Sequence, residues 1–555
     1  MSTRYALGID FGTESGRALL VNVDTGEEVA THVYPYANGV IDEALPKGGP
    51  ALGPDWALQD PNDWIETLKR TVPQVMKDAG AAPEQIVGIG VDFTSCTVLP
   101  VDGDGQPLCN NPSHHNRPHA WPKLWKHHAA QPEADKITAA IQQSGDAILE
   151  RYGGKMSSEW IFPKIWQVLD EDEEIYDAAA RFIEGGDWVV EQLCGAEARS
   201  SCMAGYKGMW DSDEGFPKQE LLASLHPKLG EIVGTKLSTD IKPLGQKAGG
   251  LTEQAAQWMG LRPGIAVGVA VIDAHAAVPG ASVTLPGRMV MVMGTSTCHM
   301  LLSDEKKMIP GLCGCVKDGI LPGYYGYEAG QAAVGDIFAW YVEHCAPKSI
   351  HDDAQEQSVS VHELLEQRAA SLAPGQNGLI ALDWWNGNRS VLVDAELSGT
   401  IVGLTLGTKP EEIYRALIEA TAFGTRRIIE SFNDAGVPIN EIYACGGLPQ
   451  RNTMLMQIYA DITGLPFYVA GSAQSSGLGA AILGAVAAGK AGGGYDDPTD
   501  AAKNMARLLD VVYKPSADAH KTYTAMYNEY LKLHDYFGRG ENNIMKKLRE
   551  MKLSK

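Results

Sequence analysis

The chain has 555 residues, of which 44% are hydrophobic and 21% are charged, as in an ordinary soluble globular protein. This length predicts two or more domains. The net charge of −23 argues against nucleic acid or an anionic membrane as the main partner, because both require a basic surface. An anionic small ligand is still compatible, since it needs only local N–H groups, a few cations or a metal ion.

The cysteines and the N-terminus indicate the cellular compartment. The nine cysteines are odd in number and widely spaced, which predicts reduced thiols. The opening residues, MSTRYALGID, contain no apolar signal segment, and the most apolar stretch, GLGAAILGAVAAGKAGG, is too short and glycine-rich to span a membrane. We therefore expect a cytoplasmic protein without a secretion signal or a membrane anchor.

In chain order, the first predicted element is a β-hairpin. Residues 5–10 and 16–23 are apolar runs separated by FGTES. Residues 86–101 repeat the order of an apolar run, an Asp and small hydroxyl residues. Residues 288–302 repeat it a third time, with GTSTC at the bend. The first and third segments predict two related halves, each beginning with a hairpin.

Helical patterns alternate with these strands, which indicates α/β domains. Residues 59–79 begin with an N-cap-like Asp-Pro, and residues 410–432 form a long amphipathic pattern that begins at Pro410. Residues 442–464 predict a strand, a Gly-Gly turn and a helix, and residues 518–555 predict a helical end. The segment 102–250, rich in Trp and His, is interpreted as an insertion that shapes a substrate cleft.

The letters DFG at residues 10–12 suggest the magnesium-binding motif of protein kinases. That motif needs a glycine-rich loop, a lysine and a His-Arg-Asp loop upstream, but only nine residues precede Asp10. Residues 484–491, GAVAAGKA, lack the final Ser or Thr of a Walker A phosphate loop. The remaining interpretations are a hairpin whose N–H groups wrap phosphates beside a Mg²⁺-binding Asp, and a plain tight hairpin capped by small polar side chains.

Two further segments favour the phosphate interpretation. These are GTSTC at 294–298 and GGLPQRN at 446–452, because a Gly-Gly turn into a helix lets the backbone approach a nucleotide closely. In this order the three segments resemble the superfamily of sugar kinases, Hsp70 and actin. Within that superfamily nearly the whole chain resembles the FGGY carbohydrate kinases, whose second signature is similar to GLTLGTKPEEIYRALIE at 403–419.

The resemblance implies two actin-like (ribonuclease H-like) α/β ATPase domains with a cleft between them. Residues 1–272 would form the sugar-binding domain and residues 273–555 the nucleotide-binding domain. A group of segments is most similar to the bacterial members that phosphorylate L-ribulose: LWKHH at 124–128, SSEWIFPKI at 157–165, DWVVEQLCG at 187–195, AGYKGMW at 204–210 and YEAGQAAVGDIFAWY at 327–341.

This likeness implies phosphoryl transfer from MgATP to L-ribulose, giving L-ribulose 5-phosphate in arabinose catabolism. The turn at 94–96 reads Thr-Ser-Cys, where members of the family are expected to vary. D-ribulose, xylulose or a related polyol therefore remains an alternative substrate. A homodimer is an open alternative to a monomer.

Asp273 is the predicted general base. It ends the apolar run GIAVGVAVID, where a buried carboxylate is costly unless it is paired or used. From position alone, a helix cap and a catalytic group are equally good interpretations. The resemblance implies that Asp273 accepts the proton of the attacking sugar hydroxyl.

Asp10 is the predicted Mg²⁺ partner, acting through water, and the alternative is a turn residue that bonds its own hairpin. The resemblance also implies contacts with the nucleotide and its phosphates by Gly12, Thr13, Glu14, Gly294, Thr295, Ser296, Gly446, Gly447 and Asn452. Plain turn chemistry is the competing interpretation for the glycines.

The sugar needs donors and acceptors that converge in a cleft. The resemblance implies that these come from Thr94, Ser95, Trp125, Lys207, Asp273, Glu328 and Gln331. Lys207 would neutralise carboxylates around the sugar or contact the transferred phosphoryl group, and the alternative is a surface lysine. For Glu328, helix capping is the competing interpretation.

The sequence disfavours a zinc site and two other functions. The His-rich stretches at 114–119 and 127–128 match no zinc-site spacing, so a loop over the sugar cleft is the preferred interpretation. An actin-like or Hsp70-like ATPase would carry a peptide-binding or polymer-forming element, which the sequence does not indicate. A sugar-binding regulator without catalysis is disfavoured because Asp10 and Asp273 occur together.

Overall fold

The computed structural model describes residues 3–553 and contains two seven-stranded sheets. The first sheet has the order β3-β2-β1-β4-β10-β9, with β11 beside β4. Its strands are β1 (Tyr5–Phe11), β2 (Ser15–Asn22), β3 (Glu28–Pro35), β4 (Ile86–Phe93), β9 (Lys247–Gly250), β10 (Ala266–Gly268) and β11 (Val271–Ile272). The predicted hairpin at 5–23 is confirmed, because β1 and β2 pair antiparallel.

The second sheet has the order β14-β15-β13-β12-β18-β19-β20. The predicted hairpin at 288–302 is confirmed as β12 and β13, which pair antiparallel. The strands are β12 (Arg288–Met293), β13 (Thr297–Ser303), β14 (Gly314–Lys317), β15 (Tyr325–Gln331), β18 (Glu441–Cys445), β19 (Phe467–Ala470) and β20 (Leu508–Tyr513).

The segment at 86–101 does not repeat the hairpin of the other two. β5 (Val98–Val101) leaves the first sheet and pairs with β6 (Arg181–Glu184). Both edges of β4 are already occupied, by β1 on one side and by β10 and β11 on the other. A returning strand therefore has no free edge of β4 to pair with.

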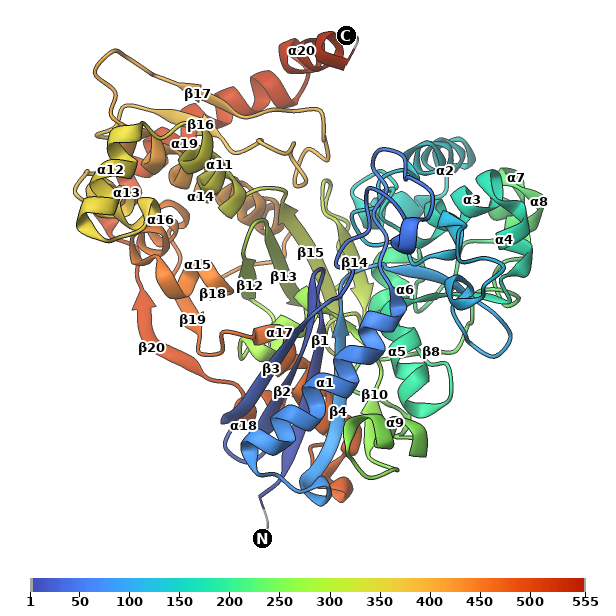
Figure 1. Ribbon diagram of the computed structural model, residues 1–555. Helices are drawn as coiled ribbons and strands as arrows, with labels where there is room; N and C mark the ends of the chain where they lie inside the picture. The colour runs from blue at the N-terminus through green and yellow to red at the C-terminus, as the bar shows by residue number, and fades with distance from the viewer. Residues whose placement is uncertain (1–2, 554–555) are drawn as a thin grey trace.

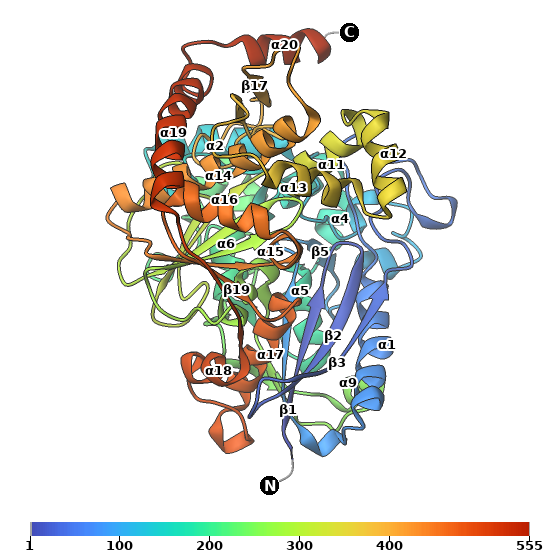
Figure 2. The same cartoon turned by 90° about the vertical axis from the view of Figure 1, so that its left-hand side faces the viewer.

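Two helices connect the sheets. α10 (Asp273–Gly280) contacts β11 and β4 of the first sheet and β12 and β13 of the second, and it packs against α17 (Ser475–Ala488). α17 comes from near the C-terminus but packs against β1 and β4 of the first sheet (Figures 1 and 2). α17 belongs to the second predicted domain by sequence but packs against the sheet of the first. The predicted boundary between residues 272 and 273 therefore does not separate two independent packing units and stays a prediction.

Glycine makes this helix–sheet contact unusually close. A Cβ atom on Gly8 would lie 1.9 Å from the carbonyl oxygen of Gly477, and one on Gly90 would lie 1.8 Å from that of Ala480. Backbone meets backbone here, and no side chain separates strand from helix. The glycine-rich stretch that resembled a poor membrane segment is therefore a buried packing helix.

The other predicted helices are confirmed. α1 (Pro61–Ala79) begins after Asp60, whose side chain accepts a hydrogen bond from the backbone N–H of Asn62, and α14 (Pro410–Asp434) begins at the predicted proline. The 442–464 segment forms β18, α15 (Gly447–Arg451) and α16 (Thr453–Thr463). The C-terminal segment forms α19 (Ala517–Gly538) and α20 (Ile544–Leu553), and residues 554–555 lie outside the described range.

Most of the remaining N-terminal helices lie on the right in Figure 1. The 102–250 segment builds a lobe with its own apolar core that includes Trp121, Trp160 and Trp166. Its helices are α2 (Gln131–Ser144), α3 (Ile161–Glu171), α4 (Glu173–Ala178), α5 (Gly185–Cys194), α6 (Ser201–Lys207), α7 (Gln219–Leu225) and α8 (Pro227–Gly230), with short strands β7 (Arg199–Ser200) and β8 (Ile241–Lys242). Elsewhere lie α9 (Glu253–Met259), α11 (Gly335–His344), α12 (Lys348–Gln357), α13 (Val361–Ala370), α18 (Pro498–Met505), β16 (Ile380–Leu382) and β17 (Thr400–Val402).

All nine cysteines are free thiols. Within residues 3–553, we find no helix with the length and apolar character needed to cross a membrane.

Candidate active site

Three aspartates gather at the carboxyl ends of neighbouring strands in the first sheet. Asp10 on β1 lies directly opposite Asp92 on the parallel strand β4, and Asp92 lies opposite Val271 on β11. Asp273 follows β11 immediately. Asp92 is not among the residues predicted from the sequence. Its context VDF nevertheless repeats the IDF around Asp10 on the neighbouring strand.

Burial dominates the electrostatics of this group. Burial, followed by the nearby Asp10 carboxylate, raises the pKa of Asp273 to about 7. Burial also raises the pKa of Asp10, although Arg17 opposes this with its Nε 3.3 Å from Oδ2. Asp92 has its pKa raised by burial and then by Asp10 and Asp273.

The aspartates Asp10 and Asp92 fit a hard cation. Neither carboxyl oxygen of Asp92 has a hydrogen-bond partner among the described residues, although both are buried. A cation would offset the repulsion between these two groups, and Mg²⁺ commonly uses one or two carboxylates and keeps several waters. Residues 3–553 contain no cluster of three or more His, Cys, Asp or Glu side chains arranged to hold a metal.

A second cluster surrounds Glu328 on β15. Lys207, at the end of α6, places Nζ 3.2 Å from Oε2, and Arg389 donates from Nη2 to Oε1 at 2.8 Å. Burial alone would raise the pKa of Glu328, but Lys207 and Arg389 outweigh burial and lower it to about 2. His275 Nε2 lies 3.6 Å from the same carboxylate, but burial lowers the pKa of His275 to about 4, so the ring is neutral at pH 7.

The structure thus brings Asp273, Lys207 and Glu328 together, although they come from different parts of the chain. Glu328 and Lys207 contribute to the electrostatics of Asp273, Glu328 by raising its pKa and Lys207 by lowering it. The backbone N–H of Ala274 donates to Asp273 Oδ1 at 2.7 Å, which fixes the carboxylate at the start of α10. Asp273 is thus the first residue of α10 and not its N-cap, which is Ile272, and its role as general base stays a prediction.

The predicted sugar turn lies beside the first hairpin. The backbone N–H of Thr94 donates to the Phe11 carbonyl at 3.1 Å. The Ser95 hydroxyl is buried without a hydrogen-bond partner among the described residues. Trp125 donates from Nε1 to the Thr13 hydroxyl at 3.1 Å, which links a predicted sugar contact to the predicted phosphate hairpin.

Lys164 is a buried residue, not predicted from the sequence, that links two loops of the candidate sugar site. Lys164 on α3 is fully buried and donates from Nζ to the carbonyls of Cys96 at 2.6 Å and Leu124 at 2.8 Å. It therefore ties the Thr94–Cys96 turn to the loop that carries Trp125. Its sequence context, SSEWIFPKI, gave no signal beyond the family resemblance.

Each predicted phosphate hairpin is closed by a backbone hydrogen bond of its own. Gly12 donates from its backbone N–H to the Ser15 carbonyl at 3.0 Å, which closes the loop that holds Thr13 and Glu14. In the second hairpin, Gly294 donates to the Ser296 carbonyl at 2.9 Å, and Thr295 lies between these two residues.

Gly446 has a φ of 99°, and a Cβ on it would lie 2.4 Å from the Met293 carbonyl oxygen. The Gly-Gly turn is thus next to the second hairpin. Gly447 has open space where its Cβ would be.

Two predicted residues do not join these clusters. Gln331 lies three positions from Glu328 on β15 and so projects from the opposite face of the strand. Its amide donates to Asp383 and to the Thr421 carbonyl and accepts from Thr425, each at 2.8 Å. These bonds engage the side chain inside the second half of the molecule, away from Glu328.

Asn452 has a structural role in this conformation. Its Oδ1 accepts from the Leu455 N–H at 2.8 Å as the N-cap of α16, and its Nδ2 donates to Glu366 at 2.6 Å. The contacts proposed for Gln331 and Asn452 with the ligands remain predictions.

Comparison with known proteins identifies the family. The N-terminal domain model of the FGGY family of carbohydrate kinases matches residues 5–280, and its C-terminal domain model matches residues 289–488. The chain belongs to the FGGY family of carbohydrate kinases. Membership confirms the predicted α/β fold class and the prediction that the protein is a kinase.

Individual relatives extend over the whole chain of this FGGY kinase. A ribulokinase of Anoxybacillus flavithermus is 55% identical over 552 residues, covering 100% of this chain and 98% of the relative. A ribulokinase of Mycolicibacterium smegmatis is 47% identical over 551 residues, covering 99% and 96% of the two chains.

Solved structures agree in fold. The xylulose kinase of Rhodospirillum rubrum superposes with a TM-score of 0.78 at 23% identity, covering 96% of this chain and 98% of that one. A glycerol kinase of Plasmodium falciparum with ADP gives a TM-score of 0.75 at 18% identity, covering 96% and 98%. At such identities the likeness establishes the fold of this FGGY kinase alone.

Proposed function

We propose that this FGGY kinase transfers the γ-phosphoryl group of ATP to L-ribulose and releases L-ribulose 5-phosphate and ADP. The observation that carries the chemistry is Asp273, a partly buried carboxylate whose pKa is raised by burial, Asp10 and Glu328 and lowered by Lys207. The full-length ribulokinase relatives supply the choice of sugar. The reaction would serve arabinose catabolism in the cytoplasm.

Asp273 acts as the general base. With its pKa raised to about 7 by burial and by Asp10, the carboxylate is half ionised at neutral pH and accepts a proton more readily than an exposed aspartate would. The attacking sugar hydroxyl loses its proton to Asp273 as its oxygen bonds to the γ-phosphorus. Phosphoryl transfer has a loose transition state, so positioning and charge account for most of the catalysis.

Glu328 and Lys207 orient the sugar. Because Glu328 stays ionised far below neutral pH, it accepts hydrogen bonds from sugar hydroxyls. Lys207 contacts both oxygens of Glu328, at 3.2 and 3.5 Å, and its three-donor ammonium keeps a further N–H for the sugar or the transferred phosphoryl group. Thr94, Ser95 and Trp125 line the sugar side of the first hairpin.

Mg²⁺ fits beside Asp10 and Asp92, which would hold it directly or through water. When bound, Mg²⁺ neutralises charge on the ATP phosphates. The backbone N–H groups of the two hairpins, around Gly12 and Gly294, and the Gly446–Gly447 turn form the remainder of the nucleotide site. Arg17 lies 3.3 Å from Asp10 and limits the charge that accumulates there.

The test is ADP release from MgATP with L-ribulose, D-ribulose, L-xylulose, D-xylulose, ribitol, L-arabinitol, glycerol or no sugar. We expect strong stimulation, with kcat/KM highest for L-ribulose. A different best sugar would overturn the substrate and leave the kinase chemistry in place. ADP release that no sugar stimulates would favour an actin-like or Hsp70-like ATPase. The homodimer stays a prediction, which sedimentation of the same preparation tests.

A further inference from the structure

Arg389 makes a closer contact with Glu328 than Lys207 does. Its Nη2 lies 2.8 Å from Oε1, whereas Lys207 Nζ lies 3.2 Å from Oε2. Lys207 also reaches Oε1, at 3.5 Å, so the two cations share that oxygen and Arg389 makes the shorter contact with it. The Arg389 side chain is 32% exposed and the Glu328 side chain 4%, so the guanidinium lies between the buried carboxylate and the solvent.

Gly330 leaves the space through which Arg389 reaches Glu328. The two strand residues Glu328 and Gly330 are two positions apart and lie on the same face of β15. A Cβ on Gly330 would lie 3.2 Å from Arg389 Cδ and 3.4 Å from its Nε, closer than ordinary contact. A glycine at this position allows the arginine stem to cross the strand.

The backbone around Arg389 is fixed against the same strand. The hydroxyl of Ser390 accepts a hydrogen bond from the Gly330 N–H at 3.2 Å. Asn388 and Asp394 exchange two backbone hydrogen bonds of 2.9 Å, which closes the loop between them. The position of the guanidinium is thus set by the loop and not only by its ion pair.

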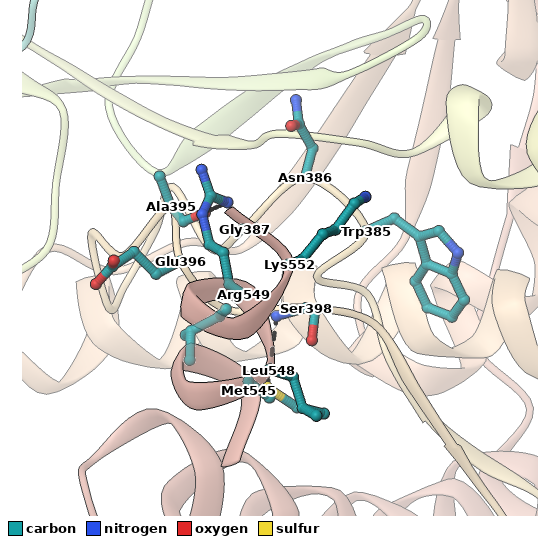
Figure 3. Close-up of a pocket in the computed structure, with 11 residues that line it drawn as sticks. Trp385, Asn386, Gly387, Ala395, Glu396, Ser398, Met545, Leu548, Arg549 and Lys552 are labelled. Atoms are coloured by element: carbon teal, nitrogen blue, oxygen red, sulfur yellow. Dashed lines mark hydrogen bonds between the residues drawn. The ribbon is translucent and has the colours of Figure 1, made fainter. Parts of the chain in front are cut away.

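The C-terminal helix α20 supports this loop from outside. Lys546 Nζ lies 2.5 Å from Asp394, and Arg549 donates to the Ala395 carbonyl at 3.1 Å. Figure 3 shows the loop and the helix on either side of a cavity of about 290 Å³. The helical end predicted for residues 518–555 therefore holds the loop that carries Arg389.

We propose that Arg389 is a positioning residue that holds the Glu328 carboxylate in one orientation for the sugar and keeps Lys207 from being its only counter-ion. This inference deepens the proposed function and rests on it, because it requires Glu328 to bind the sugar. With Arg389 present, the cluster has two cations for one carboxylate, and the ammonium of Lys207 remains available to the substrate. Without it, Lys207 is drawn to Glu328, and both groups lose their orientation toward the sugar.

The test compares Arg389→Met and Arg389→Lys in the full-length enzyme, with the best sugar of the panel. In Arg389→Met, KM for the sugar should rise roughly 10- to 100-fold, the change expected from losing one hydrogen bond to a charged group. KM for MgATP should stay within about twofold, because the loss is expected to be confined to the sugar site. A general loss of structure would instead raise KM for both substrates. Arg389→Lys should recover part of the loss, since it restores the charge without the planar fork.

Two further variants separate positioning from stability. Arg181 pairs with Glu191 at 2.9 Å and with Glu197 at 2.5 Å and is 22% exposed, so Arg181→Met removes an arginine with two carboxylate partners outside the site. It should lower the melting temperature without changing either KM. Gly330→Ala displaces the arginine stem without removing the charge, and it should raise the sugar KM even if Arg389→Met fails to fold.

The outcomes distinguish this inference from the proposed function. An active wild-type enzyme with an unchanged sugar KM in a folded Arg389→Met variant, or in Gly330→Ala, would overturn the role of Arg389 alone. Equal losses for sugar and MgATP would show a merely structural role and would also overturn it. A wild-type enzyme that phosphorylates no sugar would overturn the proposed function and this inference together.

Discussion

Asp273 shows how position sets the chemistry of a single residue. The carboxylate is partly buried, and its raised pKa of about 7 places its titration in the working range of an enzyme. Only the ionised form accepts a proton from the sugar. We therefore expect the ionised form of Asp273, which accepts the proton, to predominate above about pH 7. Its fraction should fall as the pH drops below that value.

Asp273→Asn should lower kcat by several orders of magnitude and leave MgATP binding nearly intact, because the amide cannot accept the proton. In the wild-type enzyme, kcat/KM should fall as the pH drops below about 7, and this acid limb should be absent from the residual activity of the variant. Steady-state rates from pH 5.5 to 9 with calorimetric ATP binding measure both. Near-normal turnover by the variant would exclude Asp273 as the base.

Asp92 should lower the free energy of unfolding at neutral pH, in addition to its proposed role in binding Mg²⁺. Its pKa in the folded state is raised above the ordinary value of 3.8 by burial and by Asp10. The folded protein therefore binds this proton more tightly than the unfolded chain, so the stabilisation is present at low pH and is lost as the pH rises through the folded pKa. At neutral pH Asp92 opposes folding, because the folded protein must hold either a buried charge or a proton that the unfolded chain does not bind.

Asp92→Asn should stabilise the metal-free protein at pH 7.5 by about 1 kcal/mol, because the amide is neutral and can donate to Asp10. It should also raise the Mg²⁺ concentration needed for half-maximal activity. Thermal unfolding at pH 5 and 7.5 and a Mg²⁺ titration of turnover are the measurements, and the gain should be smaller at pH 5. A less stable variant with an unchanged Mg²⁺ requirement would contradict both expectations.

At the scale of elements, α17 joins the two halves of the molecule. Its glycines and alanines allow its backbone to contact β1 and β4, whose facing positions are also glycine. This geometry explains why an apolar helix with so little side-chain volume lies in the interior. The contact depends on the absence of Cβ atoms and not on a large apolar area.

Gly90→Ala should therefore destabilise the protein by about 1–3 kcal/mol, as overpacking does in cores that cannot move apart. Its Cβ would lie 1.8 Å from the Ala480 carbonyl oxygen, and a backbone oxygen cannot rotate away. Gly103→Ala is the matched control, since no heavy atom lies within 4 Å of the added Cβ. Urea unfolding compares the two, and equal midpoints would contradict the packing argument.

At the scale of the whole molecule, the candidate sugar site draws on both sheets. Asp273 and Lys207 come from the first half of the chain, and Glu328 and Arg389 belong to the second. A sugar that contacts the residues from both halves of the chain should hold the halves together. A ligand that binds only the folded state raises the free energy of unfolding with the logarithm of the ligand concentration.

L-ribulose at 100 times its dissociation constant should stabilise the protein by about 2.7 kcal/mol, and the melting temperature should rise with each further increase in concentration. Glu328→Gln should reduce this rise, because the neutral amide accepts more weakly and leaves two cations unpaired. Scanning calorimetry with and without the sugar measures the shift. A melting temperature that L-ribulose does not change would argue against a sugar site shared by both sheets.

The sequence by itself determined the local features of this kinase. Both hairpins, the start of α14 at Pro410 and the placement of Asp10 and Asp273 at strand ends follow from patterns a few residues long. Such patterns are reliable because the backbone conformation of a turn or a cap depends mainly on adjacent side chains.

Only the tertiary structure decided which of these features meet. Asp92 is a candidate site residue because β4 pairs with β1, and Arg389 is one because its side chain contacts β15 at Gly330. Gln331 lies near Glu328 in sequence but on the opposite face, and β5 left the first sheet because β4 had no free edge. Contacts between distant segments depend on strand order and packing, which no short pattern encodes.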